Sequence, residues 1–183
     1  MTYHKRICRV SGATRPVGLP CFVTICTKYA RKIFLNKFLA NEFLGLLKKH
    51  SQENDVPIYA YCIMPDHVHL LISASHNKDI MSFVREIKSL STRIAWAYNY
   101  RGGIWQTSFY DHFLRNDEGR REVIDYIIEN PVREGLVDNW RDYQFCGSLV
   151  YDLWVGDKPP RYGCDDMEMW RGTSPRATVA VIW

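Results

Sequence analysis

The stretch that decides the fold runs Tyr61-Cys62-Ile63-Met64-Pro65-Asp66-His67-Val68-His69-Leu70-Leu71-Ile72. It joins two apolar runs, residues 57–63 and 68–73, whose composition favours β-strands. The three residues 64–66 separate the runs, and proline at the second position of a turn suits its fixed φ. The stretch therefore predicts two neighbouring strands joined by a turn, with two histidines at the beginning of the second strand.

His67 and His69 are two residues apart, so a strand directs both imidazoles to one face. Val68 and Leu70 then point to the other face. Two convergent imidazoles can chelate a metal ion. The pattern alone is weak evidence, because one of two such histidines is often a hydrogen-bonded core residue.

A second pattern supports the first. Tyr126 and Asn130 are four residues apart, which makes them neighbours on one face of a helix. Tyr126 lies roughly 130° from the centre of the apolar stripe of that helix, so it is not a natural core residue. The stripe consists of Val123, Ile124, Ile127 and Ile128. The alternative is a surface tyrosine beside an asparagine that caps the helix before Pro131.

The other patterns predict alternating strands and helices. A strand is expected at 21–27, and apolar residues at 3- and 4-residue intervals predict helices at 37–50 and 80–98. A strand is expected at 112–115. The last helix is expected to begin at Asn116 or Asp117 and to stop after Asn130, because Pro131 follows. This order is typical of an α+β ferredoxin-like sandwich, an antiparallel sheet with helices on one face.

Length and composition are those of one folded domain, with 183 residues of which 46% are hydrophobic and 24% charged. Glycine and proline interrupt the beginning of the chain. We therefore expect a basic N-terminal arm at 1–19, a catalytic domain at 20–150 and a C-terminal tail at 151–183.

Positive charge is concentrated near the N-terminus. Residues 1–50 contain ten lysines and arginines against one acid, Glu42, although the whole chain carries only +4. Such a surface suits a polyanion such as nucleic acid, and the alternative is a solvated basic face without a partner. The sequence has no recognisable signal peptide, no apolar run long enough to span a membrane and no Cys-x-x-Cys spacing of the kind found in metal sites. These features predict a cytoplasmic protein with no membrane partner.

Two imidazoles and the Asn130 amide oxygen leave coordination positions for water and a phosphate oxygen. That mixed set suits Mg²⁺ or Mn²⁺ held together with a substrate better than it suits a closed zinc site. The Tyr126 hydroxyl would then attack phosphorus. Because a phenol is a weak nucleophile at neutral pH, the site must either lower the pKa of Tyr126 or supply a base, for which His112 and Asp111 are candidates.

Taken together, these segments resemble the HUH single-tyrosine transposases (IS200-like), and within them the REP-associated tyrosine transposases. The resemblance covers about residues 15–150 and is specific because five separated segments occur in the right order. They are residues 64–72, 85–89, 105–112, 125–127 and 130–137. Two departures are Asp66, where Asn or Glu is more usual, and the absence of a histidine at 21–24.

The resemblance implies a ferredoxin-like core with His67 and His69 as metal ligands, Asn130 as the third ligand and Tyr126 as the nucleophile. It implies cleavage and rejoining of single-stranded DNA near hairpins through a 5′-phosphotyrosine intermediate, with Mg²⁺ or Mn²⁺. The DNA contacts expected on chemical grounds are Arg85, Lys88, Trp105 and Gln106, for which structural roles are the alternative.

Three matters stay open at the level of sequence. The chain is a monomer or a homodimer, and Tyr126 serves the histidines of its own chain or of a partner. One competing function is a domesticated hairpin-DNA-binding protein with little or no cleavage activity. Another is a small metallohydrolase that acts on other phosphodiesters.

Overall fold

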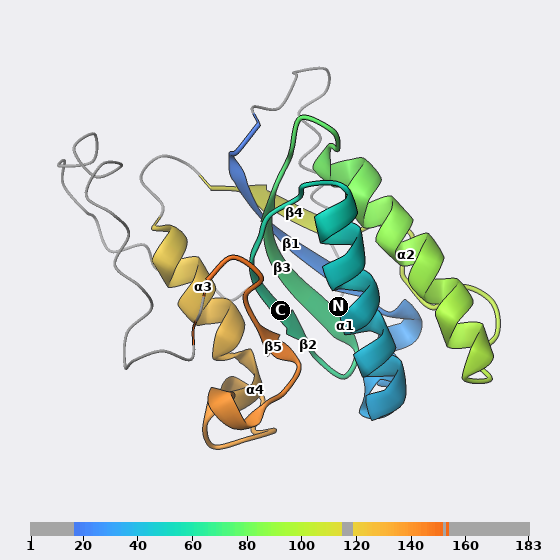
Figure 1. Ribbon diagram of the computed structural model, residues 1–183. Helices are drawn as coiled ribbons and strands as arrows, with labels where there is room; N and C mark the ends of the chain where they lie inside the picture. The colour runs from blue at the N-terminus through green and yellow to red at the C-terminus, as the bar shows by residue number, and fades with distance from the viewer. Residues whose placement is uncertain (1–16, 115–118, 152, 154–183) are drawn as a thin grey trace, which may run out of the picture.

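The computed structural model describes residues 17–114, 119–151 and 153. Its centre is an antiparallel sheet in the order β4-β1-β3-β2-β5 (Figure 1). The strands are β1 (Pro20–Cys26), β2 (Ile58–Ile63), β3 (His67–Ser73), β4 (Tyr110–Phe113) and β5 (Cys146–Gly147). The predicted α+β class and the β-α-β-β-α-β order of a ferredoxin-like sandwich are confirmed.

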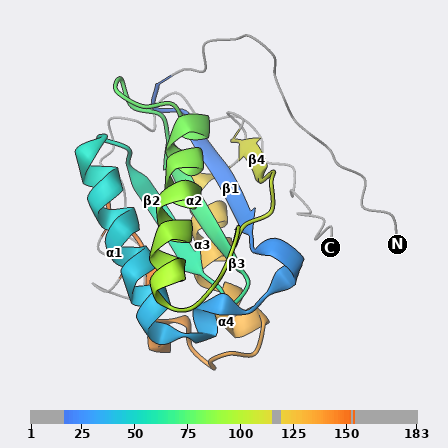
Figure 2. The same ribbon diagram turned by 90° about the vertical axis from the view of Figure 1, so that its right-hand side faces the viewer.

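The three longest helices lie on both faces of this sheet. Helices α1 (Lys37–Glu53) and α2 (Ile80–Ala97) pack on one face, and α3 (Arg120–Ile128) packs on the other. Figure 2 shows α1 and α2 in front of the sheet and α3 behind it. The expectation that helices occupy one face is therefore corrected for α3.

The composition of the central strands explains this second layer. Residues of β2 and β3 are buried on both faces, so neither face can be left in water. One core lies beneath α1 and α2 and includes Val23, Leu70 and Phe83. A second, smaller core lies beneath α3 and includes Leu71 and Ile127.

The long helices begin at capping side chains. Asn36 accepts hydrogen bonds from the backbone N–H groups of Phe38 and Leu39, and Asp79 accepts one from Ser82. These side chains satisfy donors that the first helical turn leaves unpaired. The predicted and observed boundaries of these helices agree within three residues.

The last long helix, α3, ends at Ile128, two residues before the predicted end, but Pro131 does not end the helical path of the chain as expected. It lies in the first turn of a short helix, α4 (Asn130–Arg133), where its missing N–H is tolerated. The Asn130 side chain donates to the carbonyl of Tyr126 at 2.7 Å and to that of Ile127 at 3.4 Å. Pro131 has no N–H to donate to the Ile127 carbonyl, and the Asn130 side-chain amide donates to that carbonyl instead. The chain can therefore continue in the helical direction.

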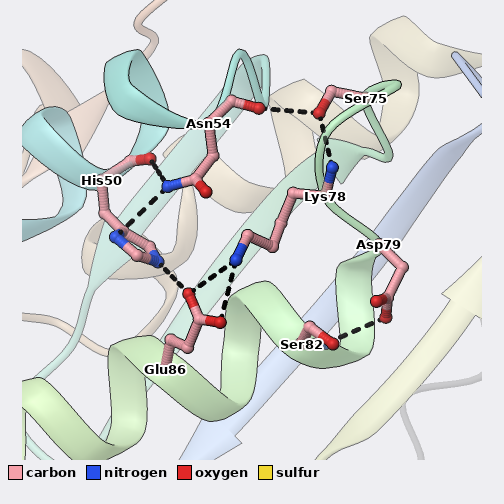
Figure 3. A network of polar contacts seen from close by, with 7 residues as sticks. All are labelled: His50, Asn54, Ser75, Lys78, Asp79, Ser82 and Glu86. Atoms are coloured by element: carbon pink, nitrogen blue, oxygen red, sulfur yellow. Dashed lines mark hydrogen bonds and ion pairs between the residues drawn. The ribbon is translucent and has the colours of Figure 1, made fainter.

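A polar network joins α1 to α2 (Figure 3). Glu86 of α2 accepts from Nε2 of His50 at 2.9 Å and from Nζ of Lys78 at 2.9 and 3.0 Å. Asn54 donates to the His50 carbonyl, and the Ser75 hydroxyl donates to the Asn54 carbonyl. The network therefore fixes the end of α1 against the loop that leads from β3 into α2.

The remaining predictions have mixed outcomes. The strand expected at 112–115 is β4, which begins two residues earlier, and β5 is not anticipated from the sequence. Asn116 and Asp117, most of the N-terminal arm and nearly all of the C-terminal tail lie outside the described residues. Within the described ranges, no helix is both long and apolar enough to cross a bilayer.

Candidate active site

The two histidines converge on the face of β3 that α3 covers. Cys26 of β1 pairs with His67, and Thr24 pairs with His69, so their side chains share that face. The Nε2 atoms of His67 and His69 lie 3.1 Å apart, and the ring centroids are separated by 4.6 Å. The predicted convergence of the imidazoles is thus present in the structure.

The other nitrogen of each ring is held by a neighbouring side chain. His67 Nδ1 donates to the Asp66 carboxylate at 2.7 Å, and His69 Nδ1 is hydrogen-bonded to Thr24 Oγ1 at 2.9 Å. Metal-binding histidines commonly have such a partner on the nitrogen that does not bind the metal, because it fixes the tautomer and the ring orientation. With Nδ1 protonated, the Nε2 lone pair of His67 faces its neighbour.

This arrangement fits a divalent cation. Two ring nitrogens 3.1 Å apart share a proton as a hydrogen bond or hold a cation between them. Nitrogen ligands at right angles on one ion, with bonds of about 2.1 Å, lie about 3 Å apart. His69 is 7% exposed, and burial, followed by the charge of His67, lowers the pKa of His69 to about 3. The imidazole is therefore neutral, the form that binds metals.

The histidines alone do not complete a site. In the described ranges, no group of three or more His, Cys, Asp and Glu side chains is arranged to hold a metal ion. Further ligands for a metal would have to come from an amide, water or substrate, so the shared metal–phosphate site stays a prediction.

Tyr126 belongs to the same cluster of rings. Its ring centroid lies 6.0 Å from that of His69 and 5.9 Å from that of Phe22, which itself stacks on His69 at 5.4 Å. The guanidinium of Arg133 lies 4.7 Å from the centre of the Tyr126 ring. The strand and the helix therefore meet within one chain, and service of the chain's own histidines by Tyr126 stays a prediction.

Asn130 is buried beside this cluster, at 7% exposure. Its Nδ2 is used in the hydrogen bond to the Tyr126 carbonyl, which leaves Oδ1 as the atom suited to a metal. The same residue thus shapes the helix and is available as an oxygen ligand. Its role as a ligand stays a prediction.

The two candidate bases differ in position. In the β1–β4 pairing, His112 lies opposite Phe22 and Asp111 lies opposite Val23. Paired residues share a face, so His112 is on the face of Tyr126 and Asp111 is on the face of α1 and α2. Register therefore favours His112 as the base.

Two of the four residues predicted to contact DNA, Trp105 and Lys88, form contacts within the protein. Trp105 is 7% exposed, packs on Phe34 and Phe43 and donates to Ser91 Oγ at 2.9 Å, so base stacking on it is ruled out while it stays in the core. Lys88 donates to the carbonyls of residues 106, 107 and 108, and burial lowers its pKa. It fixes the segment before β4. Arg85 and Gln106 are exposed and stay predictions.

Sequence reasoning missed the supporting residues. Thr24 and Phe22 are two residues apart in β1, so their side chains lie on the same face of the strand. Only the pairing register with β3 shows that this face meets His69. Arg133 follows Tyr126 by two helical turns, a signal concealed by the expectation that Pro131 ends the helix. Asp66 is adjacent to His67 in the sequence, but only the structure shows that its carboxylate accepts a hydrogen bond from that ring.

The structure defines an α+β sandwich in which a histidine pair, with His69 buried, meets a tyrosine helix. The sequence profile described as "Transposase IS200 like" matches residues 19–130, which include both histidines, Tyr126 and Asn130. The chain belongs to this family.

Individual relatives agree with that assignment. A protein of Haemophilus influenzae named "Putative REP-associated tyrosine transposase" is 31% identical over 137 residues, which cover 68% of this chain and 76% of the relative. The "REP-associated tyrosine transposase" of Escherichia coli is 33% identical over 98 residues, 53% of this chain and 57% of the relative.

A solved structure shares the fold. It is described as "Structure of the REP associates tyrosine transposase bound to a REP hairpin" and superimposes with a TM-score of 0.61. Identity is 24%, and the superposition covers 80% of this chain and 82% of the other.

Proposed function

We propose that the protein cleaves and rejoins single-stranded DNA through a covalent link to Tyr126, with a divalent cation held by His67 and His69. One observation carries the proposal: the Tyr126 ring contacts buried His69, whose Nε2 faces that of His67 at 3.1 Å. A cluster of phenol and paired imidazoles supplies a nucleophile beside ligands for a cation. Membership of a transposase family supports DNA as the substrate.

In the proposed reaction, the Tyr126 phenol oxygen forms a bond to phosphorus. The bond from phosphorus to the 3′ oxygen breaks, which yields a 5′-phosphotyrosine and a free 3′-hydroxyl. The phenolic proton goes to a base, for which His112 has the suitable face, and the departing oxygen takes up a proton. Reversal of these steps rejoins the strand without a nucleotide cofactor.

The divalent cation, Mg²⁺ or Mn²⁺, would polarise the phosphodiester and stabilise charge on its non-bridging oxygens. His67, His69 and the Asn130 Oδ1 would hold it. Asp66 and Thr24 orient the two imidazoles through their Nδ1 atoms. Arg133 adds a second positive charge beside the nucleophile, where it can bind the phosphate.

We further propose that the natural substrate contains a DNA hairpin. The related solved protein is described as bound to a REP hairpin, and two curated relatives carry the REP-associated name. The concentration of positive charge in residues 1–50 suits a polyanion.

The test uses labelled single-stranded hairpin oligonucleotides, drawn from the DNA around the gene, incubated with full-length protein and Mn²⁺. We expect a protein–DNA adduct that survives denaturation and is absent with EDTA. The matched variant is Tyr126→Phe, which keeps the ring contacts and removes only the hydroxyl; it should form no adduct.

Other outcomes select the alternatives. Tight hairpin binding without an adduct under any divalent ion would indicate a domesticated binding protein. Hydrolysis of small phosphodiesters that survives Tyr126→Phe would indicate a metallohydrolase. An undiminished adduct in Tyr126→Phe would remove Tyr126 from the proposed role.

A further inference from the structure

The segment that connects β1 to α1, residues 27–38, has an unusual surface. It includes the three most exposed large hydrophobic side chains of the described residues: Tyr29 at 81%, Phe38 at 74% and Leu35 at 64%. The same segment contains four cations and no acid; the cations are Lys28, Arg31, Lys32 and Lys37. Among the described residues these cations form no ion pair with an acid, and exposed rings among such charges suit a partner that is both anionic and flat.

The exposure of Tyr29 is imposed by the fold. The backbone on either side of it is fixed, because Lys28 N–H donates to the Ile104 carbonyl at 2.8 Å and Phe34 N–H donates to the Pro65 carbonyl at 3.0 Å. Tyr29 and Ala30 both have left-handed backbone angles, with φ of 61° and 50°. Such conformations are uncommon for residues other than glycine and persist where the surroundings hold them.

The 27–38 segment also borders the candidate active site. It begins where β1 ends, and Cys26 at that end pairs with His67. Thr27 N–H donates to the Asp66 carbonyl at 2.8 Å, and the Asp66 side chain accepts from His67. Figure 2 shows the segment in blue, beside the loop that follows α2, where Arg31 donates to the Gly103 carbonyl.

We infer that the 27–38 segment binds the unpaired nucleotides that flank the hairpin and leads them to the histidine pair. Tyr29 stacks on a base, and the lysines neutralise the adjoining phosphates. The inference rests on the proposed function, because it assigns a binding surface to that substrate.

The chemistry favours a single strand over a duplex. Aromatic rings stack on any exposed base, whereas the bases of a duplex are already stacked on one another. Lys28 Nζ lies over one face of the Tyr29 ring, 5.1 Å from its centre, so a base would stack on the other face of the ring, beside a cation.

The experiment measures the affinity of full-length protein for two labelled DNAs in EDTA, a blunt hairpin and the same hairpin with a single-stranded 5′ extension. Tyr29→Ala should weaken binding of the extended hairpin about tenfold, the size of a lost base stack, and leave the blunt hairpin unchanged. Tyr29→Phe keeps the ring and should restore the affinity.

Charge is tested with a matched pair of variants. Lys32→Gln should reduce the salt dependence of binding to the extended hairpin by about 0.7 in the logarithmic slope, as expected for one phosphate contact to a single strand. Lys49→Gln makes the same charge change at the other end of α1 and should have no effect.

The inference is overturned if Tyr29→Ala binds both DNAs like the wild type, or weakens both equally. Either result leaves the proposed function intact where the Tyr126 adduct still forms. If the wild type binds neither DNA and forms no adduct, the proposed function fails as well.

Discussion

The ring centroids of His69 in β3 and Tyr126 in α3 lie 6.0 Å apart, on the sheet face opposite α1 and α2. Both faces of the central strands are apolar, so α3 must pack on the second face, and this packing brings the phenol to the imidazole. The site therefore forms because α3 packs over the second hydrophobic core.

The partners of Nδ1 should control metal affinity. Thr24→Val removes the hydroxyl hydrogen-bonded to His69 and leaves a side chain of similar shape, so we expect Mn²⁺ affinity to fall about 10- to 100-fold. Thr24→Ser keeps the hydroxyl and serves as the control. Equal affinities in a direct Mn²⁺ titration would show that Thr24 does not orient a ligand.

Arg133 should matter for the chemical step. Arg133→Gln removes the cation above the Tyr126 ring, and adduct formation should slow about tenfold because one charge-assisted contact to phosphate is lost. Arg133→Lys keeps the charge and should recover part of the rate. The measurement is a time course of adduct formation at saturating DNA; unchanged rates in both variants would contradict the assignment.

Trp105 should be important for stability rather than for DNA contact. Trp105→Ala removes its packing on Phe34 and Phe43 and its hydrogen bond to Ser91, and the free energy of unfolding should fall by about 3–5 kcal/mol. Urea denaturation measures it. A stable variant with weakened DNA binding would restore the base-stacking role that the structure argues against.

The Figure 3 network should respond to acid. Hydrogen bonding from Lys78 comes first among the causes that lower the pKa of Glu86 below its ordinary value of 4.5. A lowered carboxylate pKa stabilises the folded state above the unfolded-state pKa, and that stabilisation is lost as the pH falls through the folded-state pKa. As the pH falls from neutral through the ordinary glutamate pKa and below it, the wild type should lose more stability than Glu86→Gln. Parallel pH curves for the two proteins would contradict this.

Local patterns predict most of the elements. Alternation in β3 places His67 and His69 on one face without knowledge of any partner strand, and apolar spacing gives the bounds of α1 and α2 to within three residues. The Tyr126–Asn130 spacing likewise depends only on helical periodicity. These features are local in the sequence, so one sequence is sufficient to predict them.

The rest depends on contacts between distant residues. Trp105 resembles a nucleic-acid contact in a basic, aromatic sequence, and only the packing of α1 and α2 shows it in the core. Thr24 becomes a partner of His69 through strand register, and the short β5 has no periodicity to detect. Pro131 illustrates a local conflict that a side chain resolves, because the Asn130 amide substitutes for the lost donor.

The most direct test of the central claim is to map the covalent link. The adduct formed with a hairpin oligonucleotide and Mn²⁺ is digested with protease and nuclease, and mass spectrometry locates the modified residue. The account predicts a nucleotide attached through phosphate to Tyr126. Attachment to another residue, such as the exposed Tyr110 that contacts Phe22 on the same face, would contradict it.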